Sequence, residues 1–364
     1  MRGSIAVALV SATALLCGLN AAPVVAQTSP QATPPYALSV FAAAPAGLSA
    51  PDSIAVTGGH VFVGYGDGHA PDGSDGLSSQ IVEFGMDGSV QHVVSVLGHS
   101  DGLKVNPATG QLWALQNEDA NPRLVIFDPE SLQRSLYLFD ATPHGGGYDD
   151  MVFLHCQAYI SASNPANNPN TKPAIITATL RGNVVHVEPF LAGNASATDI
   201  LSDASVQLNL QDPDSMTRDP LGDIVLDSQA DQELIFVTEP GRDNQRVLRL
   251  PLSYQAPSGP TPVEVDDTAF ATSSSGFILF ADKGLNTVYA LKKNAFAPGS
   301  AYTAADGGPF VGTLNTTSGG ITPIVTGLQN PGGLVFVDTS GNPATHAHDG
   351  EACGGEGDQG QQGH

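Results

Sequence analysis

Five aspartates recur at the same point of a repeated sequence pattern, each at or just before the start of an apolar run. They are Asp52, Asp101, Asp149, Asp214 and Asp267. Their spacing is about fifty residues, the length typical of one four-stranded propeller blade. Carboxylates brought together repel one another unless a cation or a shared proton lies between them. The pattern therefore indicates either a calcium site built from hard oxygen ligands or a set of aspartates that cap turns.

A second set of polar residues follows these aspartates after about fifteen positions, where a second strand would return to the same face. Its members are Asp67, Asn117, Asn164, Asp227 and Asp282. In a propeller the innermost strands all run in the same direction and the second strands run back, so both sets should face one mouth of the central channel. We predict that the five aspartates, together with Asn117 and Asn164, are metal ligands.

Two histidines accompany the aspartates, and histidine is the side chain that most readily carries protons near neutral pH. His99 lies shortly before Asp101, and His144 precedes the glycine run that leads to Asp149. We predict His99, His144 and Asp214 as catalytic residues. The reaction we have in mind is metal-assisted hydrolysis, in which a metal ion polarises a carbonyl group and an aspartate or a histidine activates water.

Short strands must position these side chains. Each aspartate is followed by a strand, a turn and another apolar strand, and further strands follow in several copies. Gly and Pro account for 41 and 27 of the 364 residues, as suits many short strands joined by turns. No comparable stretch shows helical periodicity. We predict an all-β chain that forms a six-bladed β-propeller with four-stranded antiparallel blades, and five or seven blades are the alternatives.

The end of the propeller is less regular. We assign residues 277–280 and 288–291 to the fifth unit and expect 294–320 to be a surface excursion within it. A sixth unit begins near residue 330 and has no clear middle strands. The strand at 37–41 has no blade of its own. We predict that it supplies the outer strand of the last blade, which would remove an exposed edge.

The N-terminal residues 1–26 resemble a secretory signal, with a basic residue, an apolar run and small residues at the cleavage point. The apolar run is shorter than a membrane span, and no later run reaches its length. We therefore expect a secreted or periplasmic protein without a membrane span. Its expected parts are a polar leader at 27–36, one propeller domain at 37–344 and a disordered tail at 345–364.

The charge balance limits the partners. The chain has 13 Lys+Arg and 36 Asp+Glu, which gives a net charge of −23. Its long-range field repels nucleic acid and anionic membrane surfaces. We expect a monomer that binds a small-molecule ligand or substrate at the mouth of the channel.

Two segments resemble blades of the SMP-30/gluconolactonase/NHL-like propeller superfamily. One runs from Pro213-Asp214-Ser215-Met216 to Gly222-Asp223-Ile224-Val225-Leu226-Asp227, and the other is Phe280-Ala281-Asp282-Lys283-Gly284-Leu285-Asn286-Thr287-Val288-Tyr289. The resemblance extends over roughly 38–337 as a repeat pattern. It implies the propeller fold, and it also implies where a metal ion would lie.

Lactonases of this superfamily hold a catalytic calcium ion in the channel with a Glu from the first blade and Asn and Asp from later blades. The matching position of the first blade here is Asp52. Asp149, Asp214 and Asp267 match later positions where the family often has Asn. The resemblance implies a calcium-dependent hydrolase of a lactone or ester. The alternative is a non-catalytic extracytoplasmic propeller that binds a ligand or a protein, and the sequence leaves open which of the two applies.

Overall fold

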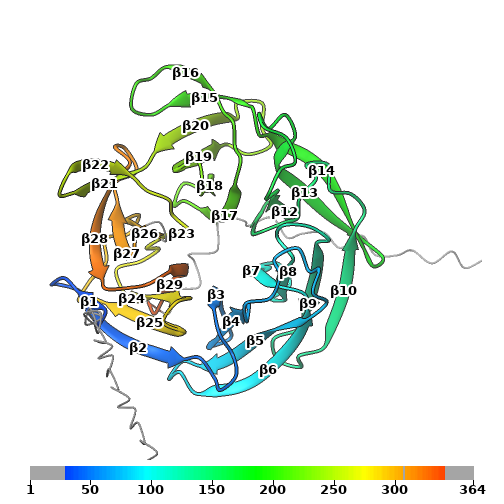
Figure 1. Ribbon diagram of the computed structural model, residues 1–364, viewed down its shortest axis with the longest axis vertical. Helices are drawn as coiled ribbons and strands as arrows, with labels where there is room; N and C mark the ends of the chain where they lie inside the picture. The colour runs from blue at the N-terminus through cyan, green and yellow to red at the C-terminus, as the bar shows by residue number, and fades with distance from the viewer. Residues whose placement is uncertain (1–28, 306–307, 341–364) are drawn as a thin grey trace, which may run out of the picture.

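The computed structural model describes residues 29–305 and 308–340, and every regular element in these ranges is a β-strand. Figure 1 shows the strands arranged as blades around a central axis, which confirms the predicted all-β propeller. The expected signal at 1–26 and the expected tail at 345–364 lie outside the described residues. Within the described ranges, no helix is long and apolar enough to cross a membrane.

The first three blades each consist of four consecutive strands that pair antiparallel in chain order. The first contains β3 (Pro51–Thr57), β4 (His60–Tyr65), β5 (Ser78–Gly85) and β6 (Val90–Leu97). The second contains β7 (Ser100–Val105), β8 (Leu112–Gln116), β9 (Arg123–Phe127) and β10 (Arg134–Phe139). The third contains β11 (Met151–Leu154), β12 (Gln157–Ser161), β13 (Pro173–Arg181) and β14 (Val184–Ala192). A short parallel pairing of β10 with β14 joins the second and third blades at their outer strands.

The fourth blade carries an additional hairpin. Its four antiparallel strands are β17 (Pro213–Arg218), β18 (Ile224–Ser228), β19 (Glu233–Thr238) and β20 (Arg246–Pro251). The hairpin of β15 (Ser196–Asp199) and β16 (Ser205–Gln207) adds to the outer edge, where β15 pairs parallel with β20. The outer edge of this blade is thereby covered.

The last two blades are interleaved. β23 (Asp267–Phe270) pairs with β26 (Ala301–Ala305), and β27 (Phe310–Leu314) and β28 (Gly320–Thr326) follow outward. The intervening strands β24 (Gly276–Asp282) and β25 (Thr287–Lys292) belong to the neighbouring blade, where β24 pairs with β29 (Pro331–Asp338). The assignment of 277–280 and 288–291 to the fifth unit is therefore wrong. The segment 294–320 is not a surface excursion, because it supplies β26 and β27.

The N-terminal strand closes the last blade. β2 (Ala37–Ala43) pairs antiparallel with β25 as its outer strand, as predicted. Part of the expected polar leader also joins a sheet, because β1 (Gln31–Ala32) pairs with β28. The hairpin of β21 (Ser253–Ala256) and β22 (Gly259–Pro262) extends that same sheet. In the described part of the chain, the strands thus sort into six antiparallel sets of four with short additional strands at outer edges.

Apolar side chains fill the space between neighbouring blades. Val61 and Val63 of β4 pack against Leu279 of β24 and Ala290 of β25, so the first and last blades share one buried cluster. Burial of such aliphatic side chains contributes about 1.5–3 kcal/mol each. This packing joins the first and last blades, which the chain also connects directly from β2 to β3.

The inner strands approach one another closely around the axis. A Cβ atom on Gly102 would lie 2.2 Å from the carbonyl oxygen of Asp149, and one on Gly333 would lie 1.9 Å from that of Asp52. Only glycine permits backbones to pass at this distance. The close approach brings the aspartates at the starts of adjacent inner strands near one another.

Candidate functional site

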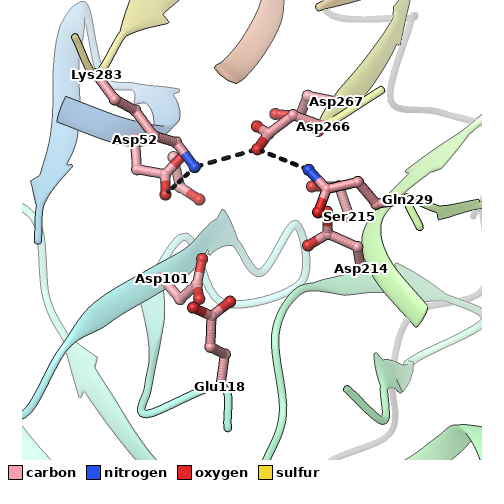
Figure 2. A pocket seen from close by; sticks show the side chains of 10 residues that line it. Asp52, Asp101, Glu118, Asp214, Ser215, Gln229, Asp266, Asp267 and Lys283 are labelled. Carbon is pink, nitrogen blue, oxygen red and sulfur yellow. Dashed lines mark hydrogen bonds and ion pairs between the residues drawn. The ribbon is translucent and has the colours of Figure 1, made fainter. Parts of the chain in front are cut away.

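The starts of the inner strands enclose a cavity of about 150 Å³ (Figure 2). Four of the predicted aspartates line it: Asp52, Asp101, Asp214 and Asp267. The fifth, Asp149, has a carboxylate oxygen within 4.8 Å of oxygens of Glu118 and Asp214. The other lining residues are Ser53, Glu118, Ser215, Gln229, Asp266 and Lys283. The structure thus brings the five predicted aspartates together around one cavity.

Backbone contacts show which aspartates are equivalent between blades. Asp150 Oδ2 accepts the N–H of Met216 at 2.9 Å, and Asp267 Oδ2 accepts the N–H of Leu334 at 2.7 Å. In both cases the aspartate binds the inner strand of the next blade, so Asp267 corresponds to Asp150. The residue that corresponds to the other ring aspartates is therefore Asp266, one position before the predicted one. The side chains of Asp266 and Asp267 both line the cavity.

The last blade has Gly332 at the position where the other inner strands carry an aspartate. Lys283, which follows β24, reaches into this place, since a Cβ atom on Gly332 would lie 2.8 Å from Lys283 Cε. Figure 2 shows its ammonium group between Asp52 and Asp266. Its Nζ lies 2.9 Å from Asp52 Oδ2 and 3.1 Å from Asp266 Oδ1. Burial alone would lower the pKa of Lys283, but the charges of Asp266 and Asp52 hold it well above its usual value. Lys283 is therefore a permanent cation in the ring of carboxylates.

We call Glu118, Asp149 and Asp214 the carboxyl cluster, because their oxygens lie within 4.8 Å of one another. Burial, reinforced by the charge of Asp214, raises the pKa of Asp149 well above its usual value. Burial also raises the pKa of Asp214, and the nearby charge of Asp266 adds to this effect. Burial would raise the pKa of Glu118 too, but hydrogen bonds with its neighbours outweigh it and hold the pKa below its usual value. Without a bound cation, the cluster must share protons.

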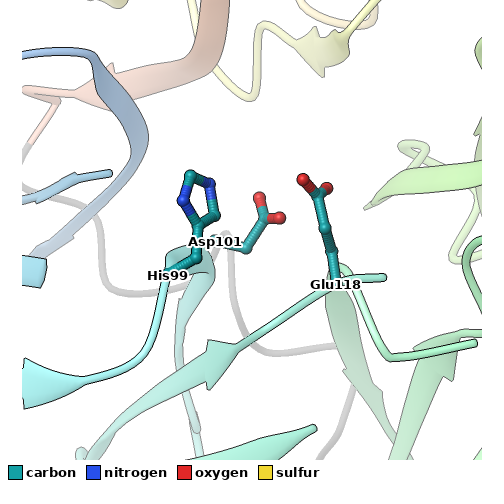
Figure 3. A group of neighbouring side chains, drawn as sticks. All are labelled: His99, Asp101 and Glu118. Carbon is teal, nitrogen blue, oxygen red and sulfur yellow. The ribbon is translucent and has the colours of Figure 1, made fainter. Parts of the chain in front are cut away.

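His99 lies beside the carboxyl cluster, as predicted from its place before Asp101. Ligand atoms of His99, Asp101 and Glu118 lie within 4.8 Å of one another, and Figure 3 shows the three side chains extending toward the same open space. His99 Nδ1 lies 3.1 Å from the carbonyl oxygen of His69. A carbonyl oxygen only accepts hydrogen bonds, so Nδ1 carries the proton in this contact. Nε2 is then the proton acceptor of the neutral ring.

His144 has different surroundings. Its side chain is 1% exposed and does not line the cavity. Nε2 lies 2.6 Å from the carbonyl oxygen of Gly147, and the ring packs 5.1 Å from the ring centroid of Tyr148. Burial lowers the pKa of His144, which favours the neutral ring. The structure therefore places this predicted catalytic residue inside the loop before Asp149, where it supports the backbone.

The predicted ligands Asn117 and Asn164 do not line the cavity. Their φ angles are 66° and 50°, in the left-handed region that asparagine tolerates better than most residues. Asn117 accepts the N–H of His99 at 2.9 Å and donates to the carbonyl oxygen of Asn121 at 3.0 Å. Asn164 is exposed, and its Nδ2 lies 3.5 Å from the carbonyl oxygen of Asp119. Both amides hold turns.

The rest of the second polar set also serves the backbone or a neighbouring strand. Asp67 accepts the N–H of Ser49 at 2.7 Å, and Asp282 accepts the N–H of Gln329 at 2.9 Å. Asp227 is fully buried and accepts a hydrogen bond from the Thr268 hydroxyl at 2.8 Å. The members of the second set therefore hold turns and strands through hydrogen bonds in this fold.

Six of the residues that line the cavity were not predicted from the sequence as site residues, and three of these share one feature: Glu118, Gln229 and Lys283. Each comes just after the second strand of its blade, since β8 ends at Gln116, β18 at Ser228 and β24 at Asp282. In each case a neighbouring polar residue belongs to the turn. The site residue itself, one or two positions after the end of the strand, points toward the axis. A charged or amide residue directly after the second strand is the signal that identifies them.

No protein-family model and no curated protein matches the sequence. Similar solved structures include a streptogramin B lyase at 12% identity, which covers 82% of this chain and 91% of that chain with a TM-score of 0.48. Virginiamycin B lyase from Staphylococcus aureus has 8% identity, coverages of 78% and 86% and a TM-score of 0.46. A gluconolactonase-like protein has 10% identity, coverages of 82% and 84% and a TM-score of 0.47. A structure of the gluconolactonase-like type is thus among those that the chain resembles, and these likenesses concern the fold alone.

Proposed function

We propose that the cavity binds one calcium ion and that the protein is a calcium-dependent hydrolase of a lactone or ester. The observation that carries this proposal is the carboxyl cluster, whose three side chains place oxygens within 4.8 Å of one another. Two like unit charges at about 4 Å repel by about 4 kcal/mol at an effective dielectric constant of about 20. A bound cation removes this repulsion and restores the ionised form of each carboxyl group.

The donor set fits calcium. Each member of the cluster ends in carboxylate oxygens, and calcium is a hard cation that takes roughly six to eight oxygen ligands. The Oδ2 atoms of Asp101 and Asp214 are buried and have no hydrogen-bond partner among the described residues. Buried polar atoms without partners cost free energy, which coordination would recover. Glu118, Asp149 and Asp214 would hold the ion, with Asp101 beside them.

Bound calcium would supply Lewis-acid polarisation of the substrate carbonyl. His99 is suited to accept a proton from water, because its Nδ1 faces the His69 carbonyl oxygen and Nε2 is left as the acceptor. Asp214 acts in this proposal as a metal ligand and not as the base. His144 takes no part, because its ring is buried against Tyr148 and Gly147.

The size of the cavity limits the ligand. Its volume is about 150 Å³, smaller than the roughly 300–1,000 Å³ of sites that enclose a drug-sized molecule. It admits an ion, water and a reacting carbonyl group, while the rest of a larger substrate would remain outside. We therefore propose a small-molecule substrate at the mouth of the channel.

One observation favours the alternative, a non-catalytic propeller that binds a ligand or a protein. Lys283 forms ion pairs with Asp52 and Asp266 at 2.9 and 3.1 Å, so part of the ring charge is already balanced. Shared protons could balance the rest without a metal ion. In that case the carboxylates would serve as hydrogen-bonding groups for a ligand, and no turnover would be found.

We also propose that the protein acts outside the cytoplasm as a monomer. The signal-like segment 1–26 supports a secreted or periplasmic location. The net charge of −23 disfavours nucleic acid as a partner.

The test combines elemental analysis of the purified protein with initial rates on a panel of lactones and esters, in calcium and in chelator. We expect one bound calcium ion per chain and a hydrolysis that chelator abolishes and calcium restores. Asp214→Asn should weaken calcium binding and lower the rate of hydrolysis, whereas Asp87→Asn, at an exposed turn, should change neither. Bound calcium without turnover would favour the binding function. Absence of both metal and turnover would contradict the proposal.

A further inference from the structure

The ring of carboxylates around the cavity is incomplete in a systematic way. Five inner strands bring an aspartate to the ring, at Asp52, Asp101, Asp149, Asp214 and Asp266, whereas the last blade has Gly332. A Cβ atom on Gly332 would lie 2.8 Å from Lys283 Cε and 2.5 Å from Asp266 Oδ2. The place of the sixth side chain is thus occupied by the Lys283 stem and by a neighbouring carboxylate.

We propose that Lys283 takes the place of one divalent cation, so that the cavity holds a single metal ion although its carboxylates could hold two. This inference rests on the proposed calcium binding for the identity of the ion. Its own content is narrower: the ammonium group determines how many cations the ring accepts. Lys283 is in this sense a residue that determines metal stoichiometry.

The contacts of the ammonium group support this role. Lys283 Nζ is held between Asp52 Oδ2 at 2.9 Å and Asp266 Oδ1 at 3.1 Å, which bridges the first and fifth members of the ring. Gln229 Nε2 also lies 3.5 Å from Asp266 Oδ1 (Figure 2). An ammonium group at this place repels a cation from the Asp52–Asp266 side and directs it to the carboxyl cluster.

Removal of the ammonium group would leave a second set of oxygen ligands. Asp52 Oδ2 and Asp266 Oδ1, which lie 2.9 and 3.1 Å from Nζ, would lose their cation. Both residues line the cavity. Buried carboxylates left unpaired are strongly destabilising, so the vacated place would favour a new cation.

The experiment measures calcium stoichiometry by isothermal titration and elemental analysis for the wild-type protein, Lys283→Met and Lys283→Arg. Methionine retains the length of the stem and removes the charge, whereas arginine retains the charge and serves as the matched control. We expect Lys283→Met to bind one calcium ion more per chain than the wild-type protein. Lys283→Arg should bind the same number as the wild-type protein.

The number of calcium ions bound by the wild-type protein tests the proposed function, whereas the difference between the wild-type protein and Lys283→Met tests the role of Lys283. Wild-type protein without calcium, together with one ion in Lys283→Met, would refute the proposed function and support the role of Lys283. A folded Lys283→Met variant with the wild-type number of ions would overturn that role. A Lys283→Met variant that is unfolded in chelator and folds in calcium would support it, because the ion would restore the missing charge. A variant that stays unfolded in saturating calcium would overturn it.

Discussion

Calcium should raise the thermal stability of the wild-type protein, and Asp214→Asn should remove most of this effect. Asp214 is 8% exposed, belongs to the carboxyl cluster and has a buried Oδ2 atom that finds no hydrogen-bond partner within residues 29–305 and 308–340. Asparagine has nearly the same shape but offers one neutral oxygen in place of a carboxylate. The substitution therefore weakens calcium binding with little change in packing.

The size of the effect follows from mass action. A ligand that binds only the folded state stabilises it by about 2.7 kcal/mol when its free concentration is about 100 times Kd. An unfolding entropy of about 2.1 cal/mol/K per residue gives roughly 0.6 kcal/mol/K for a domain of about 300 residues. The Tm of the wild-type protein should then rise by about 4 °C. A roughly thirtyfold weaker Kd in Asp214→Asn would leave a rise of about 1 °C.

The order of stability should reverse in chelator. Without the ion, the buried Asp214 carboxyl group is disfavoured by burial and by the charge of Asp266, and asparagine relieves both costs. Asp214→Asn should therefore match or exceed the wild-type Tm in chelator and fall below it in calcium. Asp87→Asn is the control, because Asp87 only accepts the N–H of Ser89 at 3.0 Å in an exposed turn.

Differential scanning calorimetry at neutral pH, with calcium and with chelator, measures all three proteins. Identical wild-type transitions in the two buffers would refute the calcium site. A full calcium shift in Asp214→Asn would instead remove Asp214 from the ligand set and leave the site to its neighbours.

Three further perturbations test other parts of the structure. His99→Asn should lower turnover by roughly 10²–10⁴-fold without loss of calcium, and a rate equal to that of the wild-type protein would exclude His99 as the base. His144→Asn should instead lower Tm and leave calcium affinity unchanged. Burial raises the pKa of Asp227 well above its usual value, so its contribution to stability is greatest below the unfolded pKa and declines as the pH rises toward the folded pKa. Asp227→Asn should therefore flatten the urea stability profile, by up to about 1.4 kcal/mol per pH unit, at pH values above the unfolded pKa of about 3.9 and below the folded pKa. An unchanged slope would contradict this. Gly332→Ala should lower the free energy of unfolding, measured by urea titration, by about 1–3 kcal/mol, because its Cβ would lie 2.5 Å from Asp266 Oδ2. Gly320→Ala is the control and should stay near wild type, because the nearest contact of its Cβ is Ser318 Oγ at 3.3 Å.

The repeat pattern was sufficient to locate the ring aspartates, because residues at the same position of each sequence repeat occupy the same place in each blade of a propeller. Asp52, Asp101 and Asp214 are each the second residue of an inner strand, Asp149 lies just before one, and all four meet at the axis. The fifth position was displaced by one residue, since Asp266 and Asp267 fit the pattern equally well. Both accept an N–H from the next blade, Asp266 from Gly333 and Asp267 from Leu334, and only the second contact matches the one between Asp150 and Met216.

Other features depend on interactions that a local pattern does not contain. The strong polar signals Asn117 and Asn164 reflect backbone conformation, because both residues have positive φ. Glu118 follows Asn117, Lys283 follows the last residue of β24, and the direction of both side chains toward the axis depends on the local backbone geometry. The assignment of β24 and β25 to the wrong blade has a similar origin. Apolar alternation indicates a strand, but it does not indicate the strand's partner.

The interleaving of the last two blades has a consequence for the way the ring is completed during folding. The β24–β25 hairpin can form locally, but its two neighbours come from distant parts of the chain: β29 follows the three outer strands of the fifth blade, and β2 lies near the N-terminus. Closure of such long loops costs chain entropy before the contacts are made. A topology rich in distant pairings folds slowly. The hairpin that delivers Lys283 to the cavity should therefore be among the last elements to be fixed, and the acidic ring would acquire its internal cation only as the two ends of the domain meet.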